Sequence, residues 1–258
     1  MSQPPADSRC QRWPLGLALL LVACPGPSKP PNNPASMQEF FFAGDPRVCS
    51  VDRWCWENPM PQGNDLLAIW ARGPRQICAV GRDGTALHYS GNAWRREPTS
   101  VHRDLHGVWA PPSKTRGGAE EFLAVGARGT LLHFRDGRWQ WRDAGTSEDL
   151  YAISGRGRRS FYVAGAKGTL RHCGEAGCVP VKVPTRATLR ALDGGGVALW
   201  IGGDGVVLRQ AAVGAPLTLV ATLKTAINAL RPRDKGGVWA AGRDGSLHPR
   251  LERERRDD

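Results

Sequence analysis

Three histidines recur at the same place in successive copies of a repeated sequence, and histidine is the commonest metal ligand among the side chains. His88, His133 and His172 each end a stretch of the form Gly-x-x-Gly-Thr-x-x-His. A metal ion needs its ligands within one coordination sphere, whereas residues at one position of a repeat are spread along the array. No Cys-x-x-Cys pair accompanies them. We therefore assign these histidines to the structure of the repeat and expect neither a metal site nor another cofactor.

Carboxylates and tyrosines are the side chains that would carry glycoside hydrolysis, which needs two carboxylates on opposite sides of one bond. Neither Asp193 nor Glu121 has a second carboxylate at a spacing that predicts such a pair. Tyr89, Tyr151 and Tyr162 lie within strand-like patterns. We expect no catalytic residue, and keep a glycosidase- or lyase-type enzyme as the alternative.

Cys24 is the residue for which the surrounding sequence predicts covalent chemistry. It follows Leu21-Val22-Ala23 at the end of an uncharged, Leu-rich run of 11 residues, Trp13 to Ala23. A helix that crosses a bilayer takes about 20 apolar residues, so this run is too short. It suits the apolar region of a signal peptide, with Arg9 and Arg12 before it. The string Leu-Val-Ala-Cys resembles the bacterial lipobox, at which a signal peptide is cut and the new N-terminal cysteine is acylated. An ordinary signal peptide or a buried helix is the alternative.

We therefore expect residues 1–23 to be a lipoprotein signal peptide and Cys24 to carry the lipid that holds the protein at a membrane. Residues 24–38 are rich in proline, which cannot continue a helix and favours an extended chain, so they predict a tether. Residue 25 is proline, whereas an aspartate at this position would resemble an inner-membrane retention signal. We expect an outer-membrane lipoprotein of the cell envelope, on the periplasmic or the surface side.

The formal net charge is +11. Such a charge permits binding to nucleic acid, but the arginines are scattered over the segments between repeats, as at Arg156, Arg158 and Arg159, with no basic helix. We expect a solvated, Arg-rich surface and no nucleic-acid partner. Anionic lipid headgroups and polysaccharide remain as alternatives.

Five cysteines remain once Cys10 leaves with the signal peptide and Cys24 is acylated. An exported protein meets an oxidising compartment, in which disulfides persist. The short spacings predict two local disulfides, and Cys78, within an apolar run, is expected to be a buried and inert thiol. The expected pairs are Cys49 with Cys55 and Cys173 with Cys178.

A repeat of about 40 residues, a period typical of propeller blades, fills the rest of the chain. Its first glycines, Gly81, Gly126, Gly165, Gly202 and Gly242, are 45, 39, 37 and 40 residues apart. Upstream of each lies a second element of the form Leu/Ile-x-Ala/Gly-Leu/Ile/Val. Each copy predicts four short strands, joined by turns in which glycine adopts positive φ. Four strands at this period predict an all-β fold, a β-propeller, with a β-solenoid as the alternative.

The two ends of the array predict how the ring closes. The fifth copy has three strands and stops at the charged tail, residues 251–258, whereas residues 52–58 align with the fourth-strand segment at 137–143. An N-terminal strand donated to the last blade would remove the open sheet edges. We expect a repeat domain over 39–250, with five four-stranded blades closed by an N-terminal strand. A truncated, longer array with an imperfect ring is the alternative.

The string Trp-Cys-Trp-Glu-Asn-Pro at residues 54–59, together with the Gly-x-x-Gly-Thr repeats, resembles a group of exported, lipid-anchored bacterial propeller-repeat proteins. They are distantly similar to the BNR/sialidase-like and YCF48-like propellers. The resemblance covers about residues 49 to 248 and implies fold and cellular location more than function. The turn lacks the Ser and Trp of the sialidase Asp-box, Ser-x-Asp-x-Gly-x-Thr-Trp, which disfavours that chemistry.

Three aromatic residues are candidates for a binding face. Trp70 and Trp109 lie on expected innermost strands, where they pack between blades or present a surface, and Tyr151 is placed to line the channel. Aromatic side chains at a ring mouth stack on sugars and on protein partners. We expect a monomeric, membrane-anchored extracytoplasmic module that binds protein or envelope polysaccharide. An enzyme or an envelope assembly factor is the alternative, and carboxylates converging in the channel would favour the enzyme.

Overall fold

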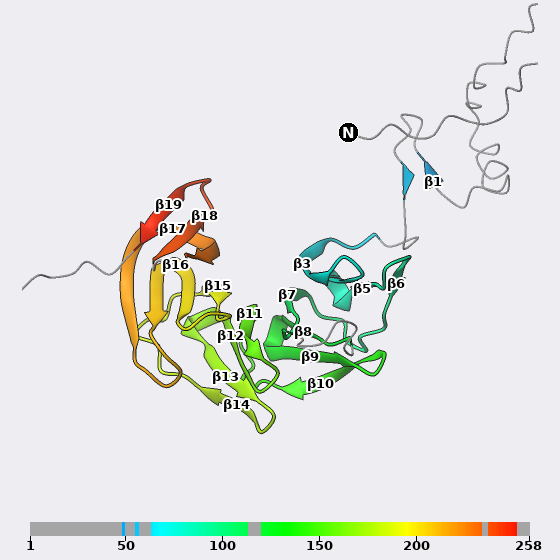
Figure 1. Ribbon diagram of the computed structural model, residues 1–258, viewed down its shortest axis with the longest axis horizontal. Coiled ribbons are helices and arrows are strands. Elements are labelled where there is room, and N and C mark those ends of the chain that lie inside the picture. The colour runs from blue at the N-terminus through cyan, green and yellow to red at the C-terminus, as the bar shows by residue number, and fades with distance from the viewer. Residues whose placement is uncertain (1–47, 50–54, 57–62, 113–119, 234–236, 252–258) are drawn as a thin grey trace, which may run out of the picture. The chain divides into compact units, whose positions relative to one another are not determined.

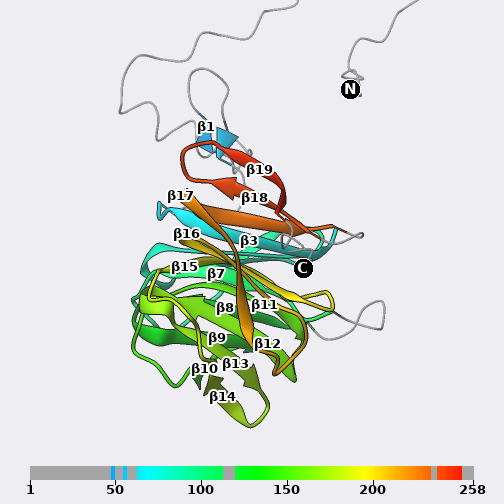
Figure 2. The same ribbon diagram turned by 90° about the vertical axis from the view of Figure 1, so that its left-hand side faces the viewer.

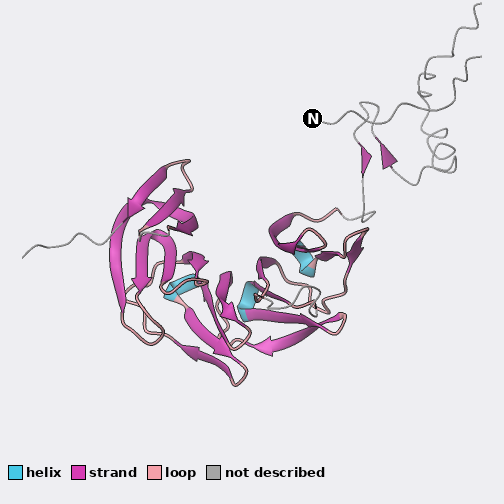
Figure 3. Cartoon of the chain, viewed as in Figure 1, coloured by secondary structure: helices cyan, strands magenta, loops and turns pink. Residues whose placement is uncertain are grey.

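A computed structural model describes residues 48–49, 55–56, 63–112, 120–233 and 237–251 (Figure 1). The chain divides into two compact units, residues 1–56 and 57–258. Strands make up most of the described residues, which also include three single-turn 3₁₀ helices and the connecting turns and loops (Figure 3). No helix among them is long and apolar enough to cross a membrane.

The first three repeats each form one antiparallel sheet of four strands in chain order. A single 3₁₀ turn follows the second strand of each sheet, where the Gly-x-x-Gly motif predicts a tight hairpin. Repeat 1 comprises β3 (Leu66–Gly73), β4 (Gln76–Gly81), η1 (Arg82–Gly84), β5 (Ala86–Tyr89) and β6 (Trp94–Arg96). Repeat 2 comprises β7 (Leu105–Trp109), β8 (Phe122–Gly126), η2 (Ala127–Gly129), β9 (Thr130–Arg135) and β10 (Arg138–Asp143). Repeat 3 comprises β11 (Leu150–Gly157), β12 (Ser160–Gly165), η3 (Ala166–Gly168), β13 (Leu170–Gly174) and β14 (Gly177–Pro180).

Repeats 4 and 5 are joined by long strands. After β15 (Leu189–Asp193), the strand β16 (Leu199–Gln210) supplies both middle strands of repeat 4, with a register shift at Gly205, whose φ is +76°. The strand β17 (Leu217–Pro232) pairs with β16 in its first half and with β18 (Val238–Gly242) in its second. Repeat 5 ends with β19 (Leu247–Leu251). Among the described residues it therefore has three strands, as the sequence predicts.

The innermost strands follow one another in the order β3, β7, β11, β15 and the second half of β17, so that consecutive repeats pack face to face (Figures 1 and 2). The core lies between them. Four clusters of buried apolar side chains fill the four interfaces between consecutive repeats. Their largest fully buried members include Phe122, Leu105, Phe161 and Leu189. Most of the stability therefore comes from contacts between repeats, because one sheet alone buries little apolar area.

The two glycines of the turn are needed for different reasons. The second glycine, for example Gly129, has a φ of +68°, as the sequence predicts for a tight turn. The first, Gly126, has an extended backbone, with φ at −165°. It is glycine because a Cβ there would lie 2.1 Å from the carbonyl oxygen of Asp104. The Asp104 carbonyl also accepts a hydrogen bond from the backbone N–H of Ala127, at 2.9 Å.

The N-terminal unit is described only at a short hairpin. β1 (Val48–Cys49) pairs with β2 (Cys55–Trp56), and Cys49 lies directly opposite Cys55 in the register. The other residues of the expected closing strand, 52–58, lie outside the described residues. So do the expected signal peptide, Cys24 and the tether, and the charged tail after Leu251. Closure into five blades therefore stays a prediction.

Candidate functional site

A hollow of about 1290 Å³ lies where the innermost strands end, and all five repeats contribute to its wall. We call it the mouth cavity. Each innermost strand reaches it with the residues at its carboxyl end. The side chains that matter below are Trp70, Arg72, Arg75, Trp109, Glu120, Ser154, Asp193 and Arg231.

The repeat itself places one residue of each copy at this cavity. We number each innermost strand from the Leu or Ile that begins its repeated segment. The residues at the fifth position, in repeats 1 to 5, are then Trp70, Trp109, Ser154, Asp193 and Arg231. The strand registers are the same in repeats 1 to 4 near this point, so equivalent residues reach equivalent places. The apolar residues at positions one, three and four are similar in all five copies. The fifth residue is aromatic in repeats 1 and 2, carries a hydroxyl in repeat 3, is acidic in repeat 4 and is basic in repeat 5.

The charges around the cavity partly offset one another. Asp193 is half-buried, and this burial raises the pKa of its carboxyl. The backbone N–H of Gly195 and the charge of Arg231 oppose that shift. Glu120 lies 3.6 Å from the Nε2 atom of His88. Arg72 and Arg75, on the hairpin between β3 and β4, add positive charge to the wall made by repeat 1.

The structure separates the three aromatic residues that the sequence singles out. Trp70 lines the mouth cavity and is 39% exposed. Trp109 also reaches the wall, but it is 3% exposed and stacks on Phe161 of repeat 3, with ring centroids 6.3 Å apart. Its role is therefore mainly packing between repeats. Tyr151 does not line this cavity.

Tyr151 belongs to a second row, formed by position two of each innermost strand. Its ring stacks on His106 of repeat 2, with centroids 5.0 Å apart, and the guanidinium of Arg190 lies 5.3 Å from its centroid on the repeat 4 side. Arg190 in turn donates two hydrogen bonds to Asp204, at 2.6 and 3.3 Å. His106, Tyr151 and Arg190 of this row join three repeats by stacking and charge, and the polar groups of His106 and Arg190 already have partners.

The recurring histidines have three different surroundings. His88 is buried against Phe122 and Phe134 of the next repeat, with both centroid distances at 5.4 Å. His133 is hydrogen-bonded through Nε2 to Glu121 at 2.7 Å, and His172 through Nε2 to Ser160 at 3.0 Å. Within the part of the chain that the structure describes, no group of three or more metal-ligating side chains is placed to hold an ion.

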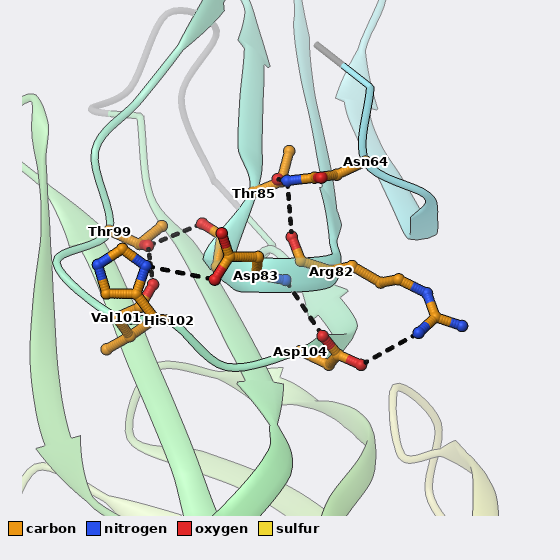
Figure 4. A network of polar contacts seen from close by, with 9 residues as sticks. Asn64, Arg82, Asp83, Thr85, Thr99, Val101, His102 and Asp104 are labelled. Carbon is orange, nitrogen blue, oxygen red and sulfur yellow. Dashed lines mark hydrogen bonds and ion pairs between the residues drawn. The ribbon is translucent and has the colours of Figure 1, made fainter.

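A polar network fastens the turns of repeats 1 and 2 to the start of the next repeat, and Figure 4 shows the one in repeat 1. The backbone N–H of Asp83, whose φ is +50°, donates to the Asp104 carboxylate at 3.1 Å. The equivalent bond in repeat 2 runs from Arg128 to Asp149 at 2.8 Å. The sequence carries a signal for this network that was not predicted above, namely an aspartate directly before the first leucine of the innermost strand in repeats 1 to 3.

One of the two expected disulfides lies among side chains that the structure describes. Cys173 and Cys178 are joined by a disulfide across the hairpin between β13 and β14. Cys49 and Cys55 are opposed in the ladder, but their side chains lie outside the described part of the structure. Cys78 is a free, buried thiol whose pKa is raised by burial.

Comparison with known proteins identifies the fold. No family model matches the chain, and no curated protein matches it. Among solved structures, Sqt1 from Saccharomyces cerevisiae matches with a TM-score of 0.60 at 12% identity, covering 73% of this chain and 61% of Sqt1. YCF48 bound to D1 peptide matches with a TM-score of 0.56 at 13% identity, covering 72% and 63%. The β-propeller domain of Cps50 (Swd1) from Myceliophteria thermophila matches with a TM-score of 0.56 at 14% identity, covering 73% and 65%.

The chain therefore spans between three fifths and two thirds of the structures that it matches. At identities this low the likeness concerns the fold alone. Together with the four-stranded antiparallel sheets and the interfaces between them, it confirms the predicted class: the chain has an all-β, β-propeller fold.

Proposed function

We propose that this protein is a β-propeller interaction module that binds a partner protein at the mouth cavity. The observation that carries the proposal is the row of fifth-position residues, in which an otherwise uniform scaffold presents Trp70, Asp193 and Arg231 on one wall. An exposed indole beside charged groups suits recognition of another protein, since Trp and Arg contribute most at protein interfaces. One of the similar structures, YCF48, is itself bound to a peptide.

The same wall disfavours the enzyme alternative. The cavity holds two carboxylates, Glu120 and Asp193; Glu120 lies 3.6 Å from the Nε2 atom of His88, and Asp193 lies near the positive charge of Arg231. Glu121, the other candidate, is hydrogen-bonded to His133. Aromatic and guanidinium groups thus outnumber carboxylates in the described wall, which suits binding better than hydrolysis. Envelope polysaccharide is the second candidate ligand, because the exposed ring of Trp70 could stack on a sugar.

The proposal includes the cellular location that the N-terminal sequence predicts. Lipid on Cys24 and the proline-rich tether would hold the module at the outer membrane, outside the cytoplasm, where a disulfide such as Cys173–Cys178 persists. This part rests on the sequence motif, since residues 1–47 lie outside the described structure.

The test is affinity capture from envelope extract with the full-length protein, repeated over a salt series and followed by chemical cross-linking. We expect one dominant partner protein that survives moderate salt, with cross-links mapping to the mouth cavity. Replacing Asp193 and Arg231 by Ala should lose it, whereas Arg138→Glu on the outer strand β10 should not. Many anionic proteins lost together as salt rises would show non-specific attraction instead and overturn the proposal.

A further inference from the structure

The loop between β15 and β16, residues 194–198, differs from its counterparts in length and composition. The hairpins of repeats 1 and 3 turn through two residues, 74–75 and 158–159, whereas this loop has five. It consists of three consecutive glycines followed by Val and Ala, and we call it the glycine loop. Glycine restricts the backbone least of all residues, so the conformation of this loop depends on contacts from outside it.

Side chains of repeat 3 hold the glycine loop. The hydroxyl of Ser154 accepts a hydrogen bond from the backbone N–H of Gly194, at 3.0 Å. The guanidinium of Arg156 donates to the backbone carbonyls of Gly196, at 2.9 Å, and of Val197. The side chain of Val197 is 80% exposed and adds little packing. Within the described part of the chain, the side-chain hydrogen bonds that fasten the exposed end of the loop therefore come from one arginine.

This conformation explains only one of the three glycines. None of them has a φ in the left-handed region. A Cβ on Gly194 would lie 3.1 Å from the Cδ1 atom of Leu199, so that position needs a small residue. A Cβ on Gly196 would meet nothing within 4 Å, and one on Gly195 would meet only the carbonyl oxygen of Gly155, at 4.0 Å. Glycine at positions 195 and 196 therefore suits a loop that also adopts a second backbone conformation.

The glycine loop forms part of the rim of the mouth cavity. Gly195 lines this cavity, and so does Asp193, directly before the loop. The backbone N–H of Gly195 stabilises the Asp193 carboxylate and opposes the rise of its pKa on burial. On another side, Gly194 and Val197 border a second hollow of about 10 Å³, which has room for about one water molecule. A movement of the loop therefore changes the cavity and the surroundings of Asp193 together.

We propose that the glycine loop is a two-position strap on the rim of the mouth cavity, latched by Arg156 and released when a carboxylate of the partner takes that guanidinium. A carboxylate accepts two charge-assisted hydrogen bonds from a guanidinium, which are stronger than bonds to neutral carbonyl oxygens. Arg156 is exposed, so an acidic side chain can compete with the loop for it. Such a ligand shifts the equilibrium because it binds the released position. Release would open the rim and free Asp193 from the N–H of Gly195. This inference rests on the proposed function and names how its site is regulated.

The first experiment measures the position of the strap in the full-length protein, without a partner. Spin labels on Val197→Cys and on Gln140→Cys of β10, both exposed positions, give the distance between the loop and repeat 2 by double electron–electron resonance. The unmodified protein, treated alike, measures any labelling of the native cysteines. We expect a main distance and a minor second one, and Arg156→Ala should raise the minor population about tenfold, because two hydrogen bonds are lost. Arg158→Ala is the matched control, since Arg158 contacts Glu175 instead of the loop, and it should change nothing. A single distance that is the same in all three proteins overturns the proposal.

The second experiment asks whether the strap needs its glycines. The double variant Gly195→Ala/Gly196→Ala fits the latched conformation without a clash. It should lower the minor population about fivefold or more, because alanine disfavours the positive-φ conformations that glycine adopts freely. Gly157→Ala, which also meets no atom within 4 Å, should leave the distances unchanged. A minor population as large in the double variant as in the unmodified protein overturns the proposal.

The third experiment tests the trigger with hexaglutamate, and with hexaglutamine as the uncharged control. At millimolar concentration, hexaglutamate should raise the released population of the unmodified protein about twofold or more, since a ligand of one state shifts the equilibrium by mass action. Hexaglutamine should not, and Arg156→Ala should not respond to either peptide. Equal responses to the two peptides, or none, overturn the proposal. If the strap holds one position while the unmodified protein still captures one partner at the mouth cavity, this inference fails and the proposed function stands.

Discussion

Replacing Gly126 by alanine tests whether the first glycine of the turn is required for space rather than for backbone conformation. Its φ of −165° is open to any residue, so alanine adds no backbone strain. Its Cβ, however, would lie 2.1 Å from the Asp104 carbonyl oxygen, at the start of the innermost strand of the same repeat. The two must move apart by about 1 Å, which as overpacking costs about 1–3 kcal/mol. Weakening the hydrogen bond from Ala127 to the Asp104 carbonyl adds about 1 kcal/mol.

We therefore expect Gly126→Ala to lower the free energy of unfolding by about 2–4 kcal/mol, or Tm by roughly 4–16 °C for a domain of this size. Urea denaturation and differential scanning calorimetry measure both quantities. Gly157→Ala is the control, because its Cβ would meet no atom within 4 Å and its φ is not positive. It should leave stability unchanged or raise it slightly. Equal effects of the two substitutions would refute the steric argument.

Two further predictions concern the lipid anchor at Cys24 and the dependence of stability on pH. Cys24→Ser should move the protein from the membrane to the soluble fraction of the envelope; persistent membrane fractionation, with the signal peptide cut, would rule out the lipid anchor. Burial lowers the pKa of His133 in the folded state, even though Glu121 acts in the opposite direction. Folding therefore favours the neutral imidazole. The free energy of unfolding is highest above the pKa of His133 in the unfolded chain, about 6.5. It decreases as the pH falls below that value, because the unfolded chain then binds the proton more readily than the folded protein does. His133→Gln should lose less stability than the unmodified protein between pH 7 and 5 in urea titrations, and an equal loss would contradict this.

The repeat could be predicted from the sequence because the residues that determine its strands and turns are close together in the chain. Alternating apolar residues and Gly-x-x-Gly-Thr turns specify strands and hairpins within a few residues. The β-propeller class was predicted this way and is confirmed, and the described residues of repeat 5 form three strands. The role of Gly126 was not predicted, because its constraint comes from a carbonyl oxygen 22 residues earlier in the chain.

The candidate site could be predicted only in part. Trp70 and Trp109 were singled out, and both reach the mouth cavity, but the sequence could not tell that one is exposed and the other packed against Phe161. Asp193 was considered as a carboxylate without a partner, and Arg231 was missed. The available signal was that both occupy the fifth position of their innermost strands, four residues after Leu189 and Ile227.

The sequence by itself determined the strands, the turns and the position in each repeat that varies. Only the tertiary structure decided which of those positions meet and which are covered. The physical reason is that burial in a stacked array is a property of the neighbouring repeat. Leu66 and Leu105 occupy the same place in the same kind of strand, yet one is exposed and the other buried, because a repeat packs in front of the second.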